Sequence, residues 1–122
     1  MQFPIERAIA MRFAEEWIAA WNAHDLERIL SHYDDDFKMA SPRIIEIAGE
    51  PKGKLRGKVA IGGYWKRGLE LLPDLHFELL EVFASIDTIC IYYHSSRAGK
   101  AVEWFEFGAD GKVIRSAGHY IK

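Results

Sequence analysis

The sequence predicts an α+β fold, in which helices pack on one face of a curved antiparallel sheet. The first 72 residues contain segments whose apolar side chains recur at helical spacing, interrupted by one short strand. From about residue 75 onward, segments rich in β-branched and aromatic residues are separated by short turns. Helices followed by a strand meander are typical of α+β proteins, and 122 residues suit a single domain spanning 1–122.

Residues 4–22 predict a long amphipathic helix. Pro4 suits its first turn, and one face is apolar, with Ile5, Ile9, Phe13, Trp17, Ala20 and Trp21. Asp25 is a suitable N-cap for a second, shorter helix from Leu26 to about Tyr33.

The segment that follows predicts a strand and a loop. Aspartates at 34–36 indicate a solvated turn, because a metal site would need accompanying His or Glu ligands. Residues 37–41 predict a short strand that Pro42 ends, and the isoleucines at 44, 45 and 47 extend or pair with it. Residues 49–58 form a basic loop that lacks the G-x-x-x-x-G-K-[ST] frame of a phosphate-binding loop.

The second half completes the predicted fold. Residues 59–72 predict a third helix, which Pro73 stops, and Ile61, Trp65, Leu69 and Leu72 keep its helical spacing. Strands are expected over 75–85, 88–96, 101–107 and 113–121. The turns between them fall at residues 86–87, 98–99 and 110–111.

Composition excludes several classes of function. The net charge is −2 with mixed signs along the chain, which gives no reason to expect nucleic acid or an anionic membrane as a partner. The N-terminus lacks the apolar core of a signal peptide, and no apolar run approaches a membrane span. Nothing indicates a cofactor or a metal, and Cys90 is the only cysteine. A cytoplasmic protein is the default expectation.

The most informative stretch is 86–107, which predicts two long strands joined by a tight turn. With Ala98 and Gly99 at the turn centre, His94 would lie opposite Glu103, and Tyr92 opposite Phe105. An imidazole and a carboxylate would then meet on a face lined by aromatic rings. A slip of one residue would swap every side chain of the first strand to the other face, and Tyr93 would replace His94.

The sequence resembles the SnoaL-like branch of the nuclear transport factor 2 superfold. The resemblance lies in the segment WIAAWNAHDL at 17–26, in YDDDF at 33–37 followed by Ser41-Pro42, in the helix 57–69 and in the final strands 103–120. It implies a cone-shaped curved sheet wrapped around a long N-terminal helix plus two shorter helices, a cystatin-like fold with a pocket at its open end. It also implies a homodimer through the outer sheet face.

Comparison with ketosteroid isomerase, an enzyme of this superfold, implies roles for single residues. Ser41 stands where that enzyme has an Asp base before a Pro, and Trp17 stands where it has the Tyr of its oxyanion hole. Glu103 stands at the position of the protonated Asp of that hole, and Trp65 replaces a supporting Tyr, whereas Tyr33 retains one. A serine hydroxyl cannot replace the base, so steroid isomerisation by that mechanism is not expected.

The candidate site follows from these positions. Glu103, His94 and Tyr33 are candidate catalytic residues, with Glu103 as the acid or base. The alternative for Glu103 is a buried structural carboxyl whose hydrogen bonds are satisfied. The candidate ligand-lining residues are Trp17, Ser41, Trp65, Tyr92, Phe105, Ser116 and Tyr120. A small apolar, oxygenated molecule is the expected ligand, either of an acid/base enzyme such as an isomerase, cyclase, dehydratase or hydrolase, or of a non-catalytic binding protein.

A third interpretation is a domain that associates with another protein through its outer sheet, anchored by Trp104 and Tyr93. Trp104 and Glu106 share this outer face of their strand, and Arg115, Ala117 and His119 share it on the next strand. An exposed Trp on a sheet is unfavourable, so this face is expected to be covered, most simply by a second copy of the chain.

Overall fold

The computed structural model describes residues 1–121, and it confirms the α+β class. In chain order the elements are α1 (Arg7–Asn22), α2 (Leu26–Leu30), β1 (Tyr33–Ala40), α3 (Pro42–Ala48), β2 (Lys54–Arg56), α4 (Lys58–Leu71), β3 (Phe77–Ala84), β4 (Thr88–Ser95), β5 (Gly99–Phe107) and β6 (Val113–Tyr120). Three helices accompany the long α1, where the sequence predicted two.

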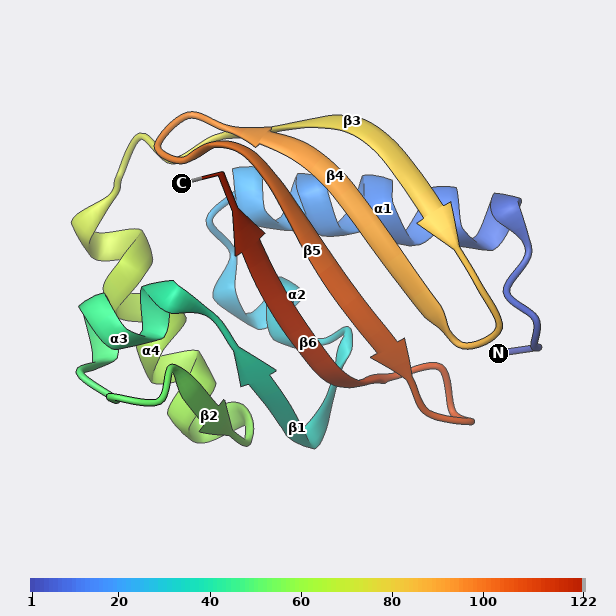
Figure 1. Cartoon of the computed structure of the whole chain (residues 1–122), viewed down its shortest axis with the longest axis horizontal. Helices are drawn as coiled ribbons and strands as arrows, with labels where there is room; N and C mark the ends of the chain where they lie inside the picture. The colour runs from blue at the N-terminus through green and yellow to red at the C-terminus, as the bar shows by residue number, and fades with distance from the viewer. Residues whose placement is uncertain (122) are drawn as a thin grey trace.

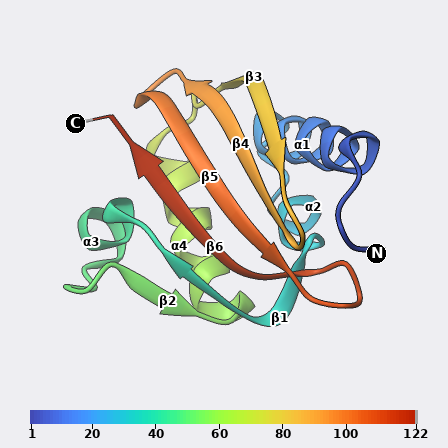
Figure 2. The ribbon, with the colours of Figure 1, turned by 45° about the vertical axis from the view of Figure 1, so that its right-hand side comes forward.

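All the strands form one curved sheet in the order β2-β1-β6-β5-β4-β3. The neighbours are antiparallel except β1 and β6, which run parallel, so the sheet is mixed rather than wholly antiparallel. The sequence pattern could not reveal this, because alternation of side chains fixes the faces of a strand and not the direction of its neighbour. Figures 1 and 2 show β3 to β6 as a long twisted layer with α1 and α4 behind it.

Helix α1 lies against the sheet through a face of small and aromatic side chains. Ala10, Ala14 and Ala20 are almost fully buried, and they let the helix approach closely. Trp17 and Trp21 project from the same face at the end of the helix nearer the β4–β5 turn. The ring of Trp17 stacks on Phe77 of β3, with centroids 5.6 Å apart. Trp17, Trp21 and Phe77 therefore gather at one end of the concave face.

The segment around Pro42 forms a helix, which corrects the expected strand extension. Pro42 occupies the first turn of α3, and the Ser41 hydroxyl caps this helix by accepting a hydrogen bond from the Arg43 backbone N–H at 3.1 Å. The side chain of Ile44, which belongs to this helix, is fully buried. Pro can either end a strand or begin a helix, and the strand pattern alone favoured the first option.

Two further expectations for residues 34–58 are wrong in part. The aspartates at 34–36 lie within β1 rather than in a turn, where Asp36 pairs with Arg56 and Asp35 with Lys58. The expected loop 49–58 contains the short strand β2, which pairs with β1. Charged side chains of β1 therefore pair with β2 through Arg56 and with the start of α4 through Lys58.

The β4–β5 hairpin has a different register from the predicted one. Ser95 pairs with Gly99 across a three-residue loop, and Gly99 takes a positive φ of 73°. His94 therefore pairs with Lys100, while Glu103 pairs with Ile91. The longer loop shifts the register by an odd number of residues, which reverses the faces of β4.

This register moves two predicted site residues to the outer face. His94 is exposed and Tyr92 is half-buried there, whereas the inner face of β4 carries Ile89, Ile91, Tyr93 and Ser95. The predicted pairing of His94 with Glu103 is therefore wrong, and so is the placement of Tyr92 in the pocket. Tyr93 takes the inward position, as in the alternative register.

Residues 1–121 have neither a membrane-spanning helix nor a cluster of metal-ligand side chains. No helix in this range is long and apolar enough to cross a membrane. No group of three or more His, Cys, Asp or Glu side chains in the same range is arranged to hold a metal ion.

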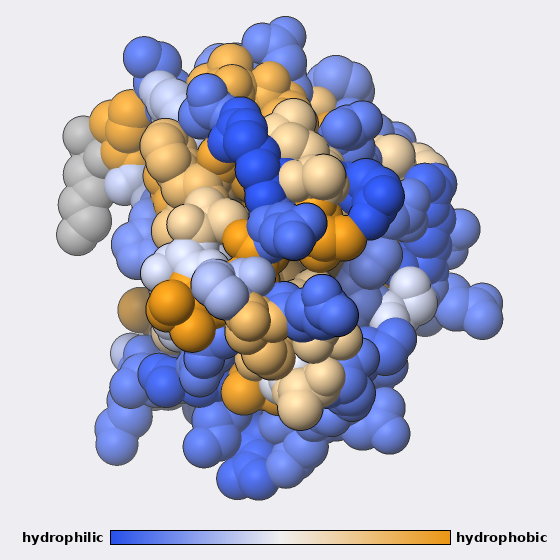
Figure 3. All heavy atoms as spheres, turned by 90° about the vertical axis from the view of Figure 1, so that its right-hand side faces the viewer, coloured by the Kyte–Doolittle hydropathy of each residue, from blue (hydrophilic) through white to orange (hydrophobic). Residues whose placement is uncertain are grey.

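At the end of the molecule with the N-terminus and the β3–β4 turn, several apolar side chains are exposed (Figure 1). They include Met1, Phe3, Phe83 and Ile86. Figure 3 faces this end and shows apolar groups interrupted by hydrophilic ones rather than one continuous patch.

Two adjacent glycines in α4 make the helix packing testable. Gly63→Ala is expected to raise the free energy of unfolding by about 0.5–1 kcal/mol, since alanine favours helix and an added Cβ has no heavy atom within 4 Å. Gly62→Ala is the matched control, because its Cβ would lie 3.2 Å from Leu30 Cδ1 and the gain should be smaller. Urea denaturation measures both, and an equal gain in the two variants would contradict the described packing.

Candidate functional site

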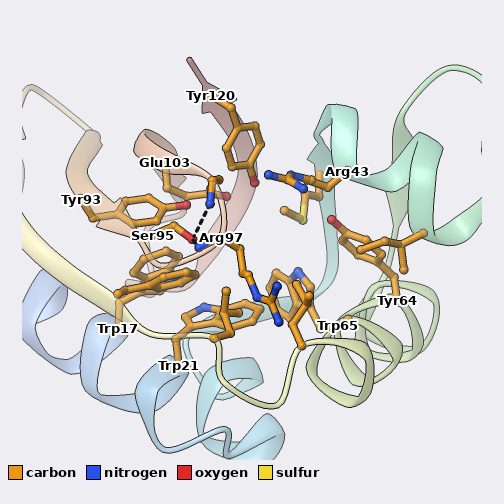
Figure 4. Close-up of a pocket in the computed structure, with 17 residues that line it drawn as sticks. Trp17, Trp21, Arg43, Tyr64, Trp65, Tyr93, Ser95, Arg97, Glu103 and Tyr120 are labelled. Carbon is orange, nitrogen blue, oxygen red and sulfur yellow. Dashed lines mark hydrogen bonds between the residues drawn. The ribbon is translucent and has the colours of Figure 1, made fainter. Parts of the chain in front are cut away.

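A pocket opens at the end of the sheet where the β4–β5 turn, the end of β6, α3 and α4 meet (Figure 4). Its volume is about 100 Å³. Four predicted site residues line it, namely Trp17, Trp65, Glu103 and Tyr120. The other lining residues are Trp21, Met39, Arg43, Ile47, Tyr64, Gly68, Leu72, Leu75, Phe77, Tyr93, Ser95, Arg97 and Ala98.

Aromatic rings make the inner wall of the pocket. The ring of Trp17 meets that of Tyr93 edge-on at 5.4 Å, and the ring of Trp21 meets that of Trp65 in the same way at 5.2 Å. Such edge-to-face contacts restrict how each ring can rotate. The wall is therefore a fixed apolar surface suited to a flat or compact apolar ligand.

Glu103 is the buried acid of this wall. Its side chain comes from the inner face of β5 and is only 3 % exposed. None of the ion pairs formed within residues 1–121 involves it. Burial raises the pKa of Glu103 from 4.5 to about 8, because an apolar site disfavours the charged form. The carboxyl is therefore mostly protonated at neutral pH and can donate a hydrogen bond.

Gly118 leaves space for the polar groups around this carboxyl. It is the cross-strand partner of Glu103 on β6. A Cβ at this position would lie 2.9 Å from Tyr120 Oη, 3.2 Å from Glu103 Oε1 and 3.3 Å from Ser41 Oγ. The three oxygen atoms thus surround a point that only a glycine leaves empty.

The hydroxyls near Glu103 stay protonated. Burial raises the pKa of Tyr120 to about 12, and the negative charge of Glu103 adds to this effect. Burial raises the pKa of Tyr93 and Tyr64 above the ordinary value as well, again with a contribution from Glu103. These groups can donate or accept hydrogen bonds, but they are poor bases at neutral pH.

Tyr33 lies behind the wall and does not line the pocket. It is 1 % exposed, and its hydroxyl accepts a hydrogen bond of 3.0 Å from Trp17 Nε1. Burial raises the pKa of Tyr33 well above its ordinary value, and the charge of Glu103 contributes. Tyr33 therefore fixes the Trp17 ring and belongs to the surroundings of Glu103 without touching a ligand.

Three other predicted ligand-lining residues are buried away from the pocket surface. Phe105 is fully buried beneath Trp17, with centroids 5.5 Å apart. Ser41 caps α3, although its hydroxyl faces the space at Gly118. Ser116 is 3 % exposed, and its Oγ has no hydrogen-bond partner among the described residues.

A second buried donor lines the pocket itself. Trp21 is 8 % exposed, and within the described chain its Nε1 has no hydrogen-bond partner. Buried polar groups normally have partners, so an orphaned indole N–H at a cavity wall is suited to a ligand acceptor or a water molecule.

Several lining residues were not predicted from the sequence. Trp21 follows Trp17 by one helical turn, and that spacing could have identified it. Tyr93 and Ser95 required the correct hairpin register. Arg43 and Arg97 come from a helix and a turn whose positions no periodic pattern reveals.

Comparisons with known proteins identify relatives of this chain. The family model described as a SnoaL-like domain matches residues 14–116. A SnoaL-like protein of unknown function from Burkholderia thailandensis E264 is 50 % identical, with a TM-score of 0.93 over 98 % of this chain and 99 % of that one. No curated protein matches the sequence.

More distant structures share the fold. AclR from Streptomyces galilaeus, proposed to be a hydroxylase, is 21 % identical, with a TM-score of 0.72 over 93 % of this chain and 79 % of that one. TerC, co-crystallised with polyporic acid, is 18 % identical, with a TM-score of 0.74 over 92 % and 91 % of the two chains. Other matching structures are described as cystatin-like and NTF2-like, which confirms the predicted fold.

The buried carboxyl predicts a pH-dependent stability. The folded state holds the Glu103 proton up to about pH 8, whereas the unfolded chain releases it near 4.5. Between these values the folded state binds more protons, so this contribution to stability is complete below pH 4.5 and is lost as the pH rises toward 8. The free energy of unfolding of the wild type should fall by on the order of 4 kcal/mol between pH 5 and pH 9, and this fall should be absent in Glu103→Gln.

Urea denaturation across this pH range measures the difference between wild type and variant. Glu106→Gln is the matched control, since Glu106 lies on the outer face of the same strand beside Arg115. Parallel stability curves for wild type and Glu103→Gln would show that the carboxyl titrates normally.

Proposed function

The chain belongs to the family of SnoaL-like domains, and on that premise we propose that it binds a small apolar molecule through an oxygen atom that accepts a hydrogen bond from protonated Glu103. The observation that carries the proposal is the buried, unpaired carboxyl in an otherwise aromatic wall. A protonated carboxyl offers one O–H donor, and in an apolar wall this donor favours a ligand carbonyl or hydroxyl.

Neighbouring groups support this role. The Trp21 Nε1 donor has no partner within the described chain, and the Tyr120 hydroxyl lies beside Glu103 at Gly118. Together they give an oxygenated ligand further groups with which to pair. TerC, of the same fold, was co-crystallised with polyporic acid, and this is consistent with a ligand-binding role for such a pocket.

Catalysis is the second candidate, and it is limited by the chemistry of the lining. Among the described residues, the lining contains one carboxyl and no histidine. Glu103 can give a proton to a ligand oxygen, but no separate base stands ready to remove one from carbon. The site therefore favours reactions that need only an acid, such as attack on a protonated carbonyl or epoxide by a nucleophile of the ligand itself or by water.

A neutral single-ring ketone tests the hydrogen bond from Glu103. The affinity for 2-cyclohexenone should be constant below pH 7 and fall about tenfold per pH unit above 8, because only protonated Glu103 donates. In Glu103→Gln the affinity should not depend on pH, whereas Glu106→Gln should behave as wild type. An NMR titration that follows the indole N–H signals of Trp17, Trp21 and Trp65 measures this affinity. An affinity of the wild type that does not change with pH would contradict the proposal.

We also propose that a second copy of the chain covers the outer sheet face. Trp104 lies there half-buried, with the Arg115 guanidinium 5.7 Å from its ring centre and Glu106 3.7 Å from Arg115. A hollow lined by Trp104, Ala117 and the β1–β2 edge adjoins it. Opposite charges around an aromatic centre are self-complementary across a two-fold axis.

Sedimentation equilibrium tests this dimer. Trp104→Glu should convert a dimer into a monomer, because it puts a charge at the centre of the covered face. Ile86→Glu is the control, since Ile86 is 63 % exposed in the β3–β4 turn, outside this face. A monomeric wild type would overturn the proposal.

A further inference from the structure

Two arginines stand at the mouth of the pocket, and they come from separate elements. Arg43 is in the first turn of α3, and Arg97 is in the turn between β4 and β5. In Figure 4, Arg43 lies beside Tyr120 and Arg97 extends across the front of Trp21 and Trp65. Both guanidinium groups are therefore within the lining that a bound ligand would face.

The charge of the lining is opposite to that of the chain. With Glu103 protonated, the described lining holds two positive charges, from Arg43 and Arg97, and no negative one. The whole chain has a net charge of −2. Glu46 and Asp74, which pair with these arginines, do not line the pocket, so the surface that faces a ligand presents positive charge and favours an anion.

The existing partners of these arginines leave room for a ligand. Arg43 Nη1 is 3.6 Å from Glu46 Oε2, which is longer than a hydrogen bond, and the guanidinium lies 5.0 Å from the ring centre of Tyr120. Arg97 donates from Nε and Nη2 to the same atom, Asp74 Oδ1, at 3.1 and 2.6 Å. The Glu46 and Asp74 side chains are 64 % and 68 % exposed, and such surface pairs are weak.

Arg97 is held at the mouth by the fold of its turn. The buried Ser95 hydroxyl accepts hydrogen bonds from the backbone N–H groups of Arg97 and Ala98, at 3.2 and 3.3 Å (Figure 4). Arg43 is held in the first turn of α3, where the Ser41 cap accepts from its backbone N–H. Both arginines therefore start from fixed backbone positions.

The size of the cavity limits the ligand. About 100 Å³ is less than the roughly 150 Å³ of a cavity known to bind benzene, so the interior has no room for more than one ring, and part of the ligand must lie in the open mouth. A ring against the tryptophans would place a substituent at the level of the arginines.

We propose that the ligand is a single-ring carboxylate whose ring also carries a carbonyl or hydroxyl oxygen. Its ring lies against Trp17, Trp21 and Trp65, its carboxylate lies between Arg43 and Arg97, and the second oxygen accepts the hydrogen bond from Glu103. The inference rests on the proposed function, since it names the ligand class of the same pocket. A guanidinium binds a carboxylate through two parallel N–H donors, which selects this group over a neutral one of the same shape.

Benzoate and benzamide test the proposal, because they share one shape and differ in charge. At pH 6.5, where Glu103 is protonated, benzoate should bind at least about tenfold more tightly than benzamide. Arg43→Gln and Arg97→Gln should each weaken benzoate binding about tenfold and leave benzamide unchanged. Arg67→Gln is the matched control, because Arg67 is an exposed arginine of α4 that does not line the pocket.

The outcomes separate this inference from the proposed function. Equal affinity for benzoate and benzamide, or unchanged benzoate binding in both arginine variants, would overturn the carboxylate assignment. If 2-cyclohexenone still binds with the pH dependence given by Glu103, the proposed function stands. If neither benzoate, benzamide nor cyclohexenone shifts the indole signals at millimolar concentration, both proposals fail.

Discussion

The burial of the Glu103 carboxyl is the constraint on which the pocket depends. A carboxylate without a cation is costly in an apolar site, and here the cost is avoided by keeping the group protonated. A protonated carboxyl still needs polar neighbours, and these come from Ser41 before α3 and from Tyr120 on β6. Gly118 completes the arrangement, because its missing side chain is the space that these oxygen atoms share. The polar surroundings of Glu103 therefore depend on Ser41, Gly118 and Tyr120 together.

The curved sheet and α1 create this site together. The cross-strand pairing of Glu103 with Gly118 fixes the carboxyl at the inner face, where the sheet bends around the helix. The hydrogen bond from Trp17 to Tyr33 fixes the helix side of the same region. Because Trp17 also packs on Phe77, Tyr93 and Phe105, the wall cannot collapse onto the carboxyl without breaking several ring contacts. The open end of the fold thus remains a cavity rather than filling with side chains.

The sequence was sufficient to predict the class of the fold and the inward face of β5. Ala101, Glu103 and Phe105 alternate over a long strand, and their face did not depend on the turn. The face of β4 depended on one loop length, and a three-residue loop in place of a two-residue turn exchanged His94 for Tyr93. The helix at Pro42 was missed because proline is compatible with both a strand end and a helix start. Arg43 and Arg97 could not be predicted for the same two reasons, since one lies in that helix and the other in that loop.

The separation of the acid from the arginines gives the pocket two layers. Burial is the cause of the raised pKa of Glu103, and no arginine lowers it, so the guanidinium charges do not compensate the carboxyl. The positive charge of Arg43 acts instead on Tyr64 and Tyr120, whose pKa values it lowers slightly against the effect of burial. The interior is therefore neutral and the mouth cationic. A ligand with an ionised group is stabilised only with that group outward, since the reverse orientation would place a negative charge against Glu103 and far from water. The order of the two layers determines which end of a ligand enters first.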